Sequence, residues 1–154
     1  MRCSLVVNGT PVEYEVEPRE LLAEILRDRT GLTGTKIACD TAQCGSCVVE
    51  LNGRTVKSCQ VLAVSATGST IVTVEGVSPA TAPLTDLQNA LRDAHAVQCG
   101  FCTPGLVMNL RELTAQTPQP TADEVREALD GTFCRCTGYV AVVDAVAVPA
   151  GDLR

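Results

Sequence analysis

Short runs of apolar residues separated by polar turns fill the first 75 residues of the chain. Residues 4–17 contain two such runs around Asn8-Gly9, and residues 47–59 repeat the pattern around Asn52-Gly53. Asn-Gly between strand-like runs is a strong signal for a β-hairpin. Residues 69–75 form a further strand-like run. The pattern therefore predicts two hairpins followed by a final strand.

The spacing of the apolar residues changes at residues 20–28, where it fits an α-helix. Leu21, Leu22, Ile25 and Leu26 fall on one helical face. Gly31 follows as a stop signal. A helix with one apolar face needs a surface to pack against. We therefore expect a mixed sheet wrapped on this helix.

The composition changes at residues 76–83, where two prolines, a glycine and small polar residues indicate a linker. The strand signals stop beyond it. The sequence thus predicts an α+β protein with one domain over residues 1–77 and a helical domain over residues 84–150. Four helices are expected in the second domain, over residues 84–96, 103–116, 121–131 and 139–148.

Three of these helices carry start signals. Thr85 or Asp86 can cap the first helix, and Pro104 suits the first position of the second. Thr121 and Glu124 have the spacing of a capping box for the third. The fourth is a short apolar run without such a signal.

Composition and charge narrow the classes of protein. Apolar residues make up 45% of the 154 residues, as in globular chains, and the net charge of −6 disfavours nucleic acid or an anionic membrane as a partner. No apolar run is long enough for a signal peptide or a membrane span. We therefore expect a cytoplasmic chain, and a reducing compartment favours metal binding or redox chemistry over disulfides for its nine cysteines.

Four of the cysteines have the spacing of a plant-type [2Fe–2S] site. Cys39, Cys44 and Cys47 form C-x4-C-x2-C, and Cys59 follows at the end of the second predicted hairpin. A loop with this spacing must curl tightly to present three thiolates, and Gly45 suits that backbone. The spacing is a strong indication of a cluster.

A second group contains two pairs. Cys99 and Cys102 form C-x2-C, and Cys134 and Cys136 form C-x-C, with both pairs near predicted helix boundaries. Helix N-termini offer free N–H donors and a partial positive charge to an anionic cluster. Four thiolates can also hold zinc, so this pattern alone leaves zinc open.

The remaining reactive side chains give no further site. Cys3 lies outside both groups and is expected to be a small core residue. His95 is the only histidine, which excludes a Rieske centre and favours a packed or surface role. No nucleophile–base arrangement is present, so no catalytic residue is expected on this chain.

Three strings together resemble the iron–sulfur subunit of the molybdenum hydroxylases, the family that includes xanthine dehydrogenase and aerobic carbon monoxide dehydrogenase. They are GTKIACDTAQCGSCVVELNGRTVKSC, QCGFCTPGLVM and CRCTGY. The resemblance covers nearly the whole chain. It implies a β-grasp, plant-ferredoxin-like domain followed by an all-α four-helix bundle, with one [2Fe–2S] cluster in each.

The same resemblance assigns the residues of the two clusters. An outer cluster would be held by Cys39, Cys44, Cys47 and Cys59, and an inner one by Cys99, Cys102, Cys134 and Cys136. Gln98 and Cys136 would face the pterin of a molybdopterin cofactor on a large partner subunit. Electrons would pass through the inner and then the outer cluster to FAD on a medium subunit, in a complex expected to be a dimer of heterotrimers.

Small departures from the family pattern leave every ligand in place. Ala42, Ser46 and Thr132-Phe133 replace residues more usual in the family. Thr41 after Cys39-Asp40 resembles the carbon monoxide dehydrogenase branch, which makes a complex of that kind one expectation. Two alternatives stay open: a free-standing two-cluster ferredoxin and a zinc-stapled interaction module.

Overall fold

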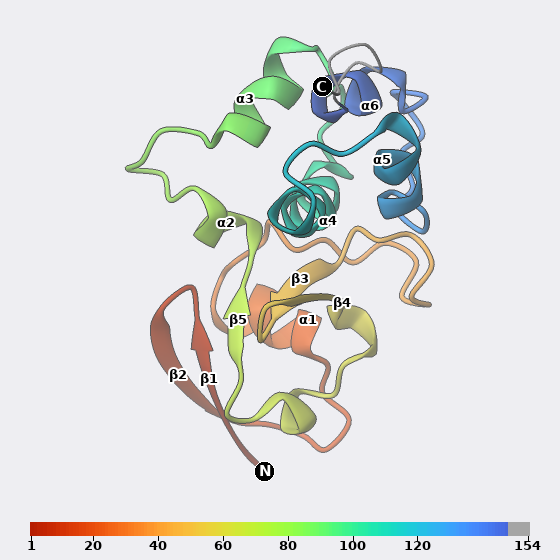
Figure 1. Cartoon of the computed structure of the whole chain (residues 1–154). Coiled ribbons are helices and arrows are strands. Elements are labelled where there is room, and N and C mark those ends of the chain that lie inside the picture. Colours follow the sequence, from red (N-terminus) through yellow and green to blue (C-terminus); the bar gives the residue numbers. More distant parts are fainter. Residues whose placement is uncertain (148–154) are drawn as a thin grey trace.

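A computed structural model describes residues 1–147, so the last residue of the predicted fourth helix and the predicted domain end at 150 lie outside the described residues. The first half of the chain forms a five-stranded mixed sheet in the order β2-β1-β5-β3-β4 (Figure 1). Only β1 and β5 pair in parallel; the other neighbours are antiparallel. The strands are β1 Arg2–Val7, β2 Thr10–Glu15, β3 Val48–Leu51, β4 Arg54–Lys57 and β5 Thr70–Val72.

Both predicted hairpins are confirmed. β1 pairs with β2 around Asn8-Gly9, and β3 pairs with β4 around Asn52-Gly53. All four turn residues have positive φ, between 49° and 84°. Two successive residues of positive φ are what a tight type I′ turn requires, and Asn-Gly reaches that conformation at little cost. Short 3₁₀ turns at Ser58–Gln60 and Ala63–Ala66 follow β4.

The helix expected at residues 20–28 is present as α1 Leu22–Glu24, continued by a π-helical turn at Ile25–Arg29. Leu22, Ile25 and Leu26 are fully buried and pack with apolar residues from β1, β3 and β5 in one core. Leu21 is only half-buried. The predicted sheet wrapped on a helix is thus confirmed, and hydrophobic burial is its main stabilising term.

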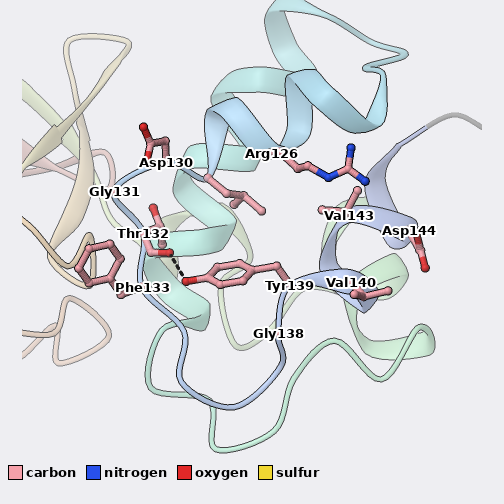
Figure 2. Close-up of a pocket in the computed structure, with 11 residues that line it drawn as sticks. Arg126, Asp130, Gly131, Thr132, Phe133, Gly138, Tyr139, Val140, Val143 and Asp144 are labelled. Carbon is pink, nitrogen blue, oxygen red and sulfur yellow. Dashed lines mark hydrogen bonds between the residues drawn. The ribbon is translucent and has the colours of Figure 1, made fainter.

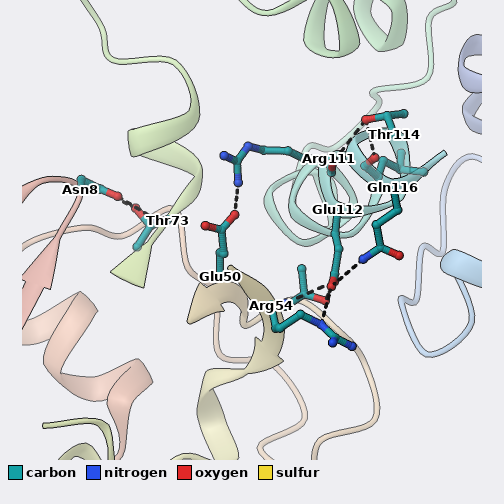
Figure 3. Close-up of polar contacts among 10 residues, drawn as sticks. Asn8, Glu50, Arg54, Thr73, Arg111, Glu112, Thr114 and Gln116 are labelled. Atoms are coloured by element: carbon teal, nitrogen blue, oxygen red, sulfur yellow. Dashed lines mark hydrogen bonds and ion pairs between the residues drawn. The ribbon is translucent and has the colours of Figure 1, made fainter. Parts of the chain in front are cut away.

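The strand predicted for residues 69–75 is too long. β5 ends at Val72, and α2 Val74–Val77 follows inside the expected strand and linker. The Thr73 N–H donates to Asn8 Oδ1 at 2.9 Å. It therefore bonds to a side chain of the first hairpin instead of continuing the hydrogen bonds of the sheet. Figure 3 shows this contact between Asn8 and Thr73. A side-chain acceptor that competes with the ladder is a common way to end a strand.

The second half is helical, as predicted, with α3 Asp86–Asp93, α4 Thr103–Gln116, α5 Ala122–Ala128 and α6 Val140–Val146. Each helix packs against two others of the set, because α3 and α5 both contact α4 and α6. Capping boxes at Thr85 and Thr121 and a proline in the first turn of α4 confirm the predicted starts. None of the helices within residues 1–147 is long and apolar enough to cross a membrane.

α4 connects the two halves, because it lies along β3 and β4 (Figure 1). Glu112 accepts hydrogen bonds from Arg54 Nε at 3.0 Å and from the Thr55 N–H at 3.2 Å, and Arg111 pairs with Glu50 (Figure 3). These polar contacts fix the orientation of α4 on the second hairpin.

Candidate metal centres

Three thiols of the first group, Cys39, Cys44 and Cys47, lie in the loop between the π-helical turn and β3, and Cys59 lies in the 3₁₀ turn that follows β4. The backbone N–H groups of Thr41 and Cys44 donate to Cys39 Sγ at 3.4 and 3.3 Å. Cys47 and Cys59 pack together in a small buried cluster, 2% and 1% exposed. The first group therefore contains one half-exposed pair of cysteines, Cys39 and Cys44, and one buried pair, Cys47 and Cys59.

Hydrogen bonding and burial push the thiols of this group in opposite directions. Hydrogen bonds from Thr41 and then Cys44 lower the pKa of Cys39 to about 6. Burial raises the pKa of Cys47 to about 12. A metal binds the thiolate form of cysteine, so metal binding must remove the proton of the Cys47 thiol. The metal then coordinates the sulfur, which burial keeps from water.

The second group lies between α3 and α4 and between α5 and α6. Cys136 Sγ lies 3.4 Å from Cys99 Sγ, and the thiols of Cys102 and Cys134 lie close enough to shift each other's pKa. Cys102 directly precedes α4 and is 7% exposed, whereas Cys99 and Cys136 are exposed. The chain thus brings together four thiols that are up to 37 residues apart, with one pair at the surface and one beneath it.

Each pair of this group combines a thiol of lowered pKa with one of raised pKa. The Phe101 N–H and Cys136 lower the pKa of Cys99, while the bond to Cys99 raises that of Cys136. Burial raises the pKa of Cys102 to about 12. Burial also acts against ionisation of Cys134, but hydrogen bonds from Thr137 outweigh it and lower the pKa to about 7.

The paired arrangement fits a binuclear cluster. Each iron of a [2Fe–2S] cluster takes two protein thiolates, so a site for it consists of two pairs rather than four sulfurs around one point. Both groups have this form. The donor set therefore fits one [2Fe–2S] cluster in each group, which would supply one-electron redox chemistry.

Sequence reasoning gave no role to two residues of the CRCTGY string that support Cys134. Thr137 donates to Cys134 Sγ through its N–H and its hydroxyl, at 3.5 and 3.2 Å. Tyr139 accepts a hydrogen bond from the Cys134 N–H at 2.7 Å and donates to the Thr132 carbonyl at 3.0 Å. The motif itself was the signal, because it placed both residues within five positions of the cysteine.

Tyr139 also forms part of the wall of an open pocket of about 460 Å³ between α5 and α6 (Figure 2). Its backbone conformation is left-handed, with φ 67°, so the side chain turns back toward the 132–134 segment. None of the nine cysteines, all of which the structure describes, lines this pocket. It lies beside the second thiol group and is separate from it.

The two thiol groups are joined by a direct backbone contact. The Phe133 N–H donates to the Cys44 carbonyl at 2.9 Å. Gly45 has φ +72°, and a Cβ there would lie 2.6 Å from the Gly131 carbonyl oxygen. Gly105, in the first turn of α4, is in close contact with the Gly45 carbonyl oxygen. Glycine at both positions lets the segments approach this closely. The sequence predicted Gly45 only for the tight curl of its own loop, which its positive φ fits, and gave no role to Gly105.

The other residues singled out from the sequence lie as follows. Gln98 is exposed beside the second group. Cys3 is fully buried in the core of the sheet, as predicted, and its thiol donates to the Ala63 carbonyl at 3.0 Å. His95 is exposed just after α3, and its N–H donates to the Arg92 carbonyl.

Comparison with protein families divides the chain in two. Residues 5–70 match the family described as 2Fe-2S iron-sulfur cluster binding domain. Residues 73–147 match the family described as [2Fe-2S] binding domain. The two matches support one cluster-binding fold in each half.

Relatives match nearly the whole length of the chain. The nicotine 6-hydroxylase small subunit of Paenarthrobacter nicotinovorans is 44% identical over 147 residues, which are 96% of this chain and 88% of that protein. A probable xanthine dehydrogenase subunit of Bacillus subtilis strain 168 is 38% identical, over 88% and 77% of the two chains. In the crystal structure of quinoline 2-oxidoreductase from Pseudomonas putida 86, one chain matches with a TM-score of 0.92 and 48% identity, over 97% of this chain and 91% of that chain.

Proposed function

Because this chain belongs to the iron–sulfur small subunits of the molybdenum hydroxylase and xanthine dehydrogenase family, we propose that it transfers electrons within such a complex. The relatives are subunits of oxidoreductase complexes, and two [2Fe–2S] domains are common to the family. In the proposal, electrons leave a molybdopterin centre on a large subunit and reach FAD on a medium subunit. The two domains proposed are residues 1–77, a β-grasp ferredoxin fold, and 84–150, a four-helix bundle.

One observation carries the proposal: eight thiols lie in two groups of two pairs, and the Cys44–Phe133 hydrogen bond joins the groups. Such an arrangement can hold two one-electron carriers side by side. The sequence offers no nucleophile–base pair of its own. The chain is therefore suited to electron transfer rather than to chemistry on a substrate.

The exposure of the cysteines indicates which partner subunit each cluster would face. Cys99, Cys136 and Gln98 are exposed at one end, which supports placing Gln98 and Cys136 against the pterin of the large subunit. The half-exposed Cys39 loop lies at the other end and would face the flavin subunit. A cytoplasmic complex built as a dimer of heterotrimers belongs to the same proposal.

The names of the relatives favour one class of substrate for the complex. Nicotine, xanthine and quinoline all contain a nitrogen heteroaromatic ring. We therefore place the hydroxylation of an N-heteroaromatic compound first. A carbon-monoxide-dehydrogenase-like complex remains the second candidate, because Thr41 follows Cys39-Asp40 as in that branch.

The test is purification of the tagged chain from its host, followed by metal, sulfide and paramagnetic resonance analysis. We expect about four iron and four sulfide per chain, two distinct binuclear signals after reduction, and co-purifying subunits that bear molybdenum and flavin. Zinc in place of iron would support the interaction module instead. Two clusters on a chain that purifies alone would support the free-standing ferredoxin.

A further inference from the structure

Lys57 lies where the two thiol groups meet. Its ammonium, at the end of β4, donates to the carbonyl oxygens of Ala42 and Gln43 at 2.6 and 3.3 Å. On its other side is Gly131, where an added Cβ would lie 3.0 Å from Lys57 Nζ. The cation is therefore wedged between the loop of the first group and the segment that leads to Cys134.

The loop that Lys57 holds has an unusual backbone. Asp40 and Ala42 have φ of +53° and +60°, in the left-handed region that residues with a side chain rarely adopt. Such a conformation persists only where neighbouring groups hold it. The two bonds from Lys57 supply that support directly before Cys44, whose carbonyl accepts the Phe133 N–H.

A short through-bond connection between the groups crosses this junction. It runs from the Cys44 carbonyl over a 2.9 Å hydrogen bond to the Phe133 amide, and Cys134 is the next residue. Further close contacts between the two segments involve Gly45, Gly131 and Thr132. The side-chain amide of Asn109 in α4 donates a hydrogen bond to the Thr132 hydroxyl at 2.7 Å.

We propose that Lys57 is a positioning residue for electron transfer between the two clusters: it holds the Cys44 carbonyl against the Phe133 amide and places a positive charge at that junction. This inference rests on the proposed function. One electron leaves the cluster of the second group and enters that of the first, so the first is reduced, the second is oxidised, and no proton or covalent bond moves.

The charge has its own consequence. A cation close to a cluster favours the state with the added electron, and hydrogen bonding and burial around the sulfurs also set the potential. Loss of the Lys57 charge should therefore make the potential of the first cluster more negative. It should also let the 42–44 segment move away from Phe133, which weakens the coupling between the clusters.

The experiment compares K57M, K57R and K36M with the unmodified protein in the intact complex. Lys36 is the only other lysine, and its ammonium donates at 2.7 Å to the Thr33 carbonyl, which precedes the cysteines, rather than to the 42–43 carbonyls that Lys57 holds. Redox titration followed by paramagnetic resonance gives each cluster's potential and the magnetic interaction between the two reduced clusters. Flash reduction gives the rate of electron transfer between them.

In K57M we expect a more negative potential for the first cluster, a smaller magnetic interaction and a several-fold slower transfer, with the potential of the second cluster nearly constant. K57R should recover most of the lost rate, and K36M should behave like the unmodified protein. A K57M complex with unchanged potential, interaction and rate overturns the inference.

A K57M variant that loses the first cluster calls for K57Q, because its amide can still donate to the Ala42 carbonyl without the charge. The inference is also overturned if K57Q binds both clusters and leaves the reduction potential of the first cluster and the rate of electron transfer unchanged. Failure of the proposed function is distinguishable, since it would show as fewer than two binuclear signals in the unmodified protein.

Discussion

Gly105, in the first turn of α4, contacts the carbonyl oxygen of Gly45 in the cysteine loop. The contact is between backbone atoms, so neither side can move away without shifting a whole segment. It brings α4 of the helical half against the loop of the first thiol group. The two halves are thus packed through their metal-binding segments as well as through the surface of the sheet.

Replacing Gly105 with alanine should therefore destabilise the protein by about 1–3 kcal/mol, the usual range for overpacking. Helix propensity acts in the opposite direction, since alanine inside a helix is about 1 kcal/mol more favourable than glycine. A net loss in the free energy of unfolding, measured with denaturant, thus isolates the clash. A neutral or stabilised G105A variant would show that the loops are free to separate.

Glu112 should stabilise the packing of α4 on β4 through its charged hydrogen bonds. Its side chain is 20% exposed and accepts bonds from Arg54 and Thr55. E112Q keeps the shape and loses the charge, so we expect a loss of about 1–2 kcal/mol in the free energy of unfolding at neutral pH. E127Q, on the exposed side of α5, is the matched control and should change little.

The same carboxylate predicts a pH dependence. Burial acts to raise the pKa of Glu112, but hydrogen bonds from Thr55 and then Arg54 outweigh it, and the pKa lies below the ordinary value of 4.5. The stabilisation is therefore complete above that value and is lost as the pH falls through the lower, folded-state pKa. The stability difference between E112Q and the unmodified protein should shrink between about pH 5 and pH 3. A constant difference would mean that the charge does not contribute.

Local signals predicted most of the fold because they act within a few residues. Asn-Gly turns, the capping box at Thr121 and the proline of α4 each depend on neighbours in the sequence, and all are present in the structure. The end of β5 could not be predicted in this way. It depends on Asn8, 65 residues away in the sequence, whose side chain takes the Thr73 N–H.

For the candidate sites too, local patterns were predictable from the sequence and contacts between distant residues were not. Spacing alone grouped the eight thiols, and the structure brings each group together in pairs. The contact between Cys44 and Phe133 spans 89 residues, and no periodicity or motif announces it. The support that Lys57 gives to the Ala42 carbonyl has no sequence signal either, because a carbonyl can accept from any donor that the fold brings close.

Tyr139 should matter for the second cluster through the backbone of Cys134. Y139F removes the acceptor of the Cys134 N–H and the donor to the Thr132 carbonyl, both partly buried. Leaving these groups without partners should cost about 1–3 kcal/mol. We also expect an altered paramagnetic resonance signal from the second cluster and an unchanged one from the first. Equal change in both signals would point to a global defect.

Two cysteine variants test the separation of core and cluster thiols. Cys3 is buried with its thiol on the Ala63 carbonyl, a bond that a serine hydroxyl can also make, so C3S should retain both cluster signals. C136S should impair the second cluster and, in the proposed complex, slow electron transfer through this chain, while the first cluster remains. Loss of a cluster signal in C3S would assign Cys3 a role that its position does not suggest.

Removal of the clusters should unfold the chain. Only four of its residues are aromatic, the sheet core is small, and the buried Cys47 and Cys59 pack on Ala23 of α1. Ligation of these thiols links the start of β3 to the turn after β4, so metal binding contributes directly to the free energy of folding. We expect chelation of the iron under reducing conditions to cause one cooperative loss of circular dichroism, together with the loss of visible absorbance. An apoprotein that keeps the native spectrum would show that the sheet and the helices are stable without metal, and that the clusters serve electron transfer alone.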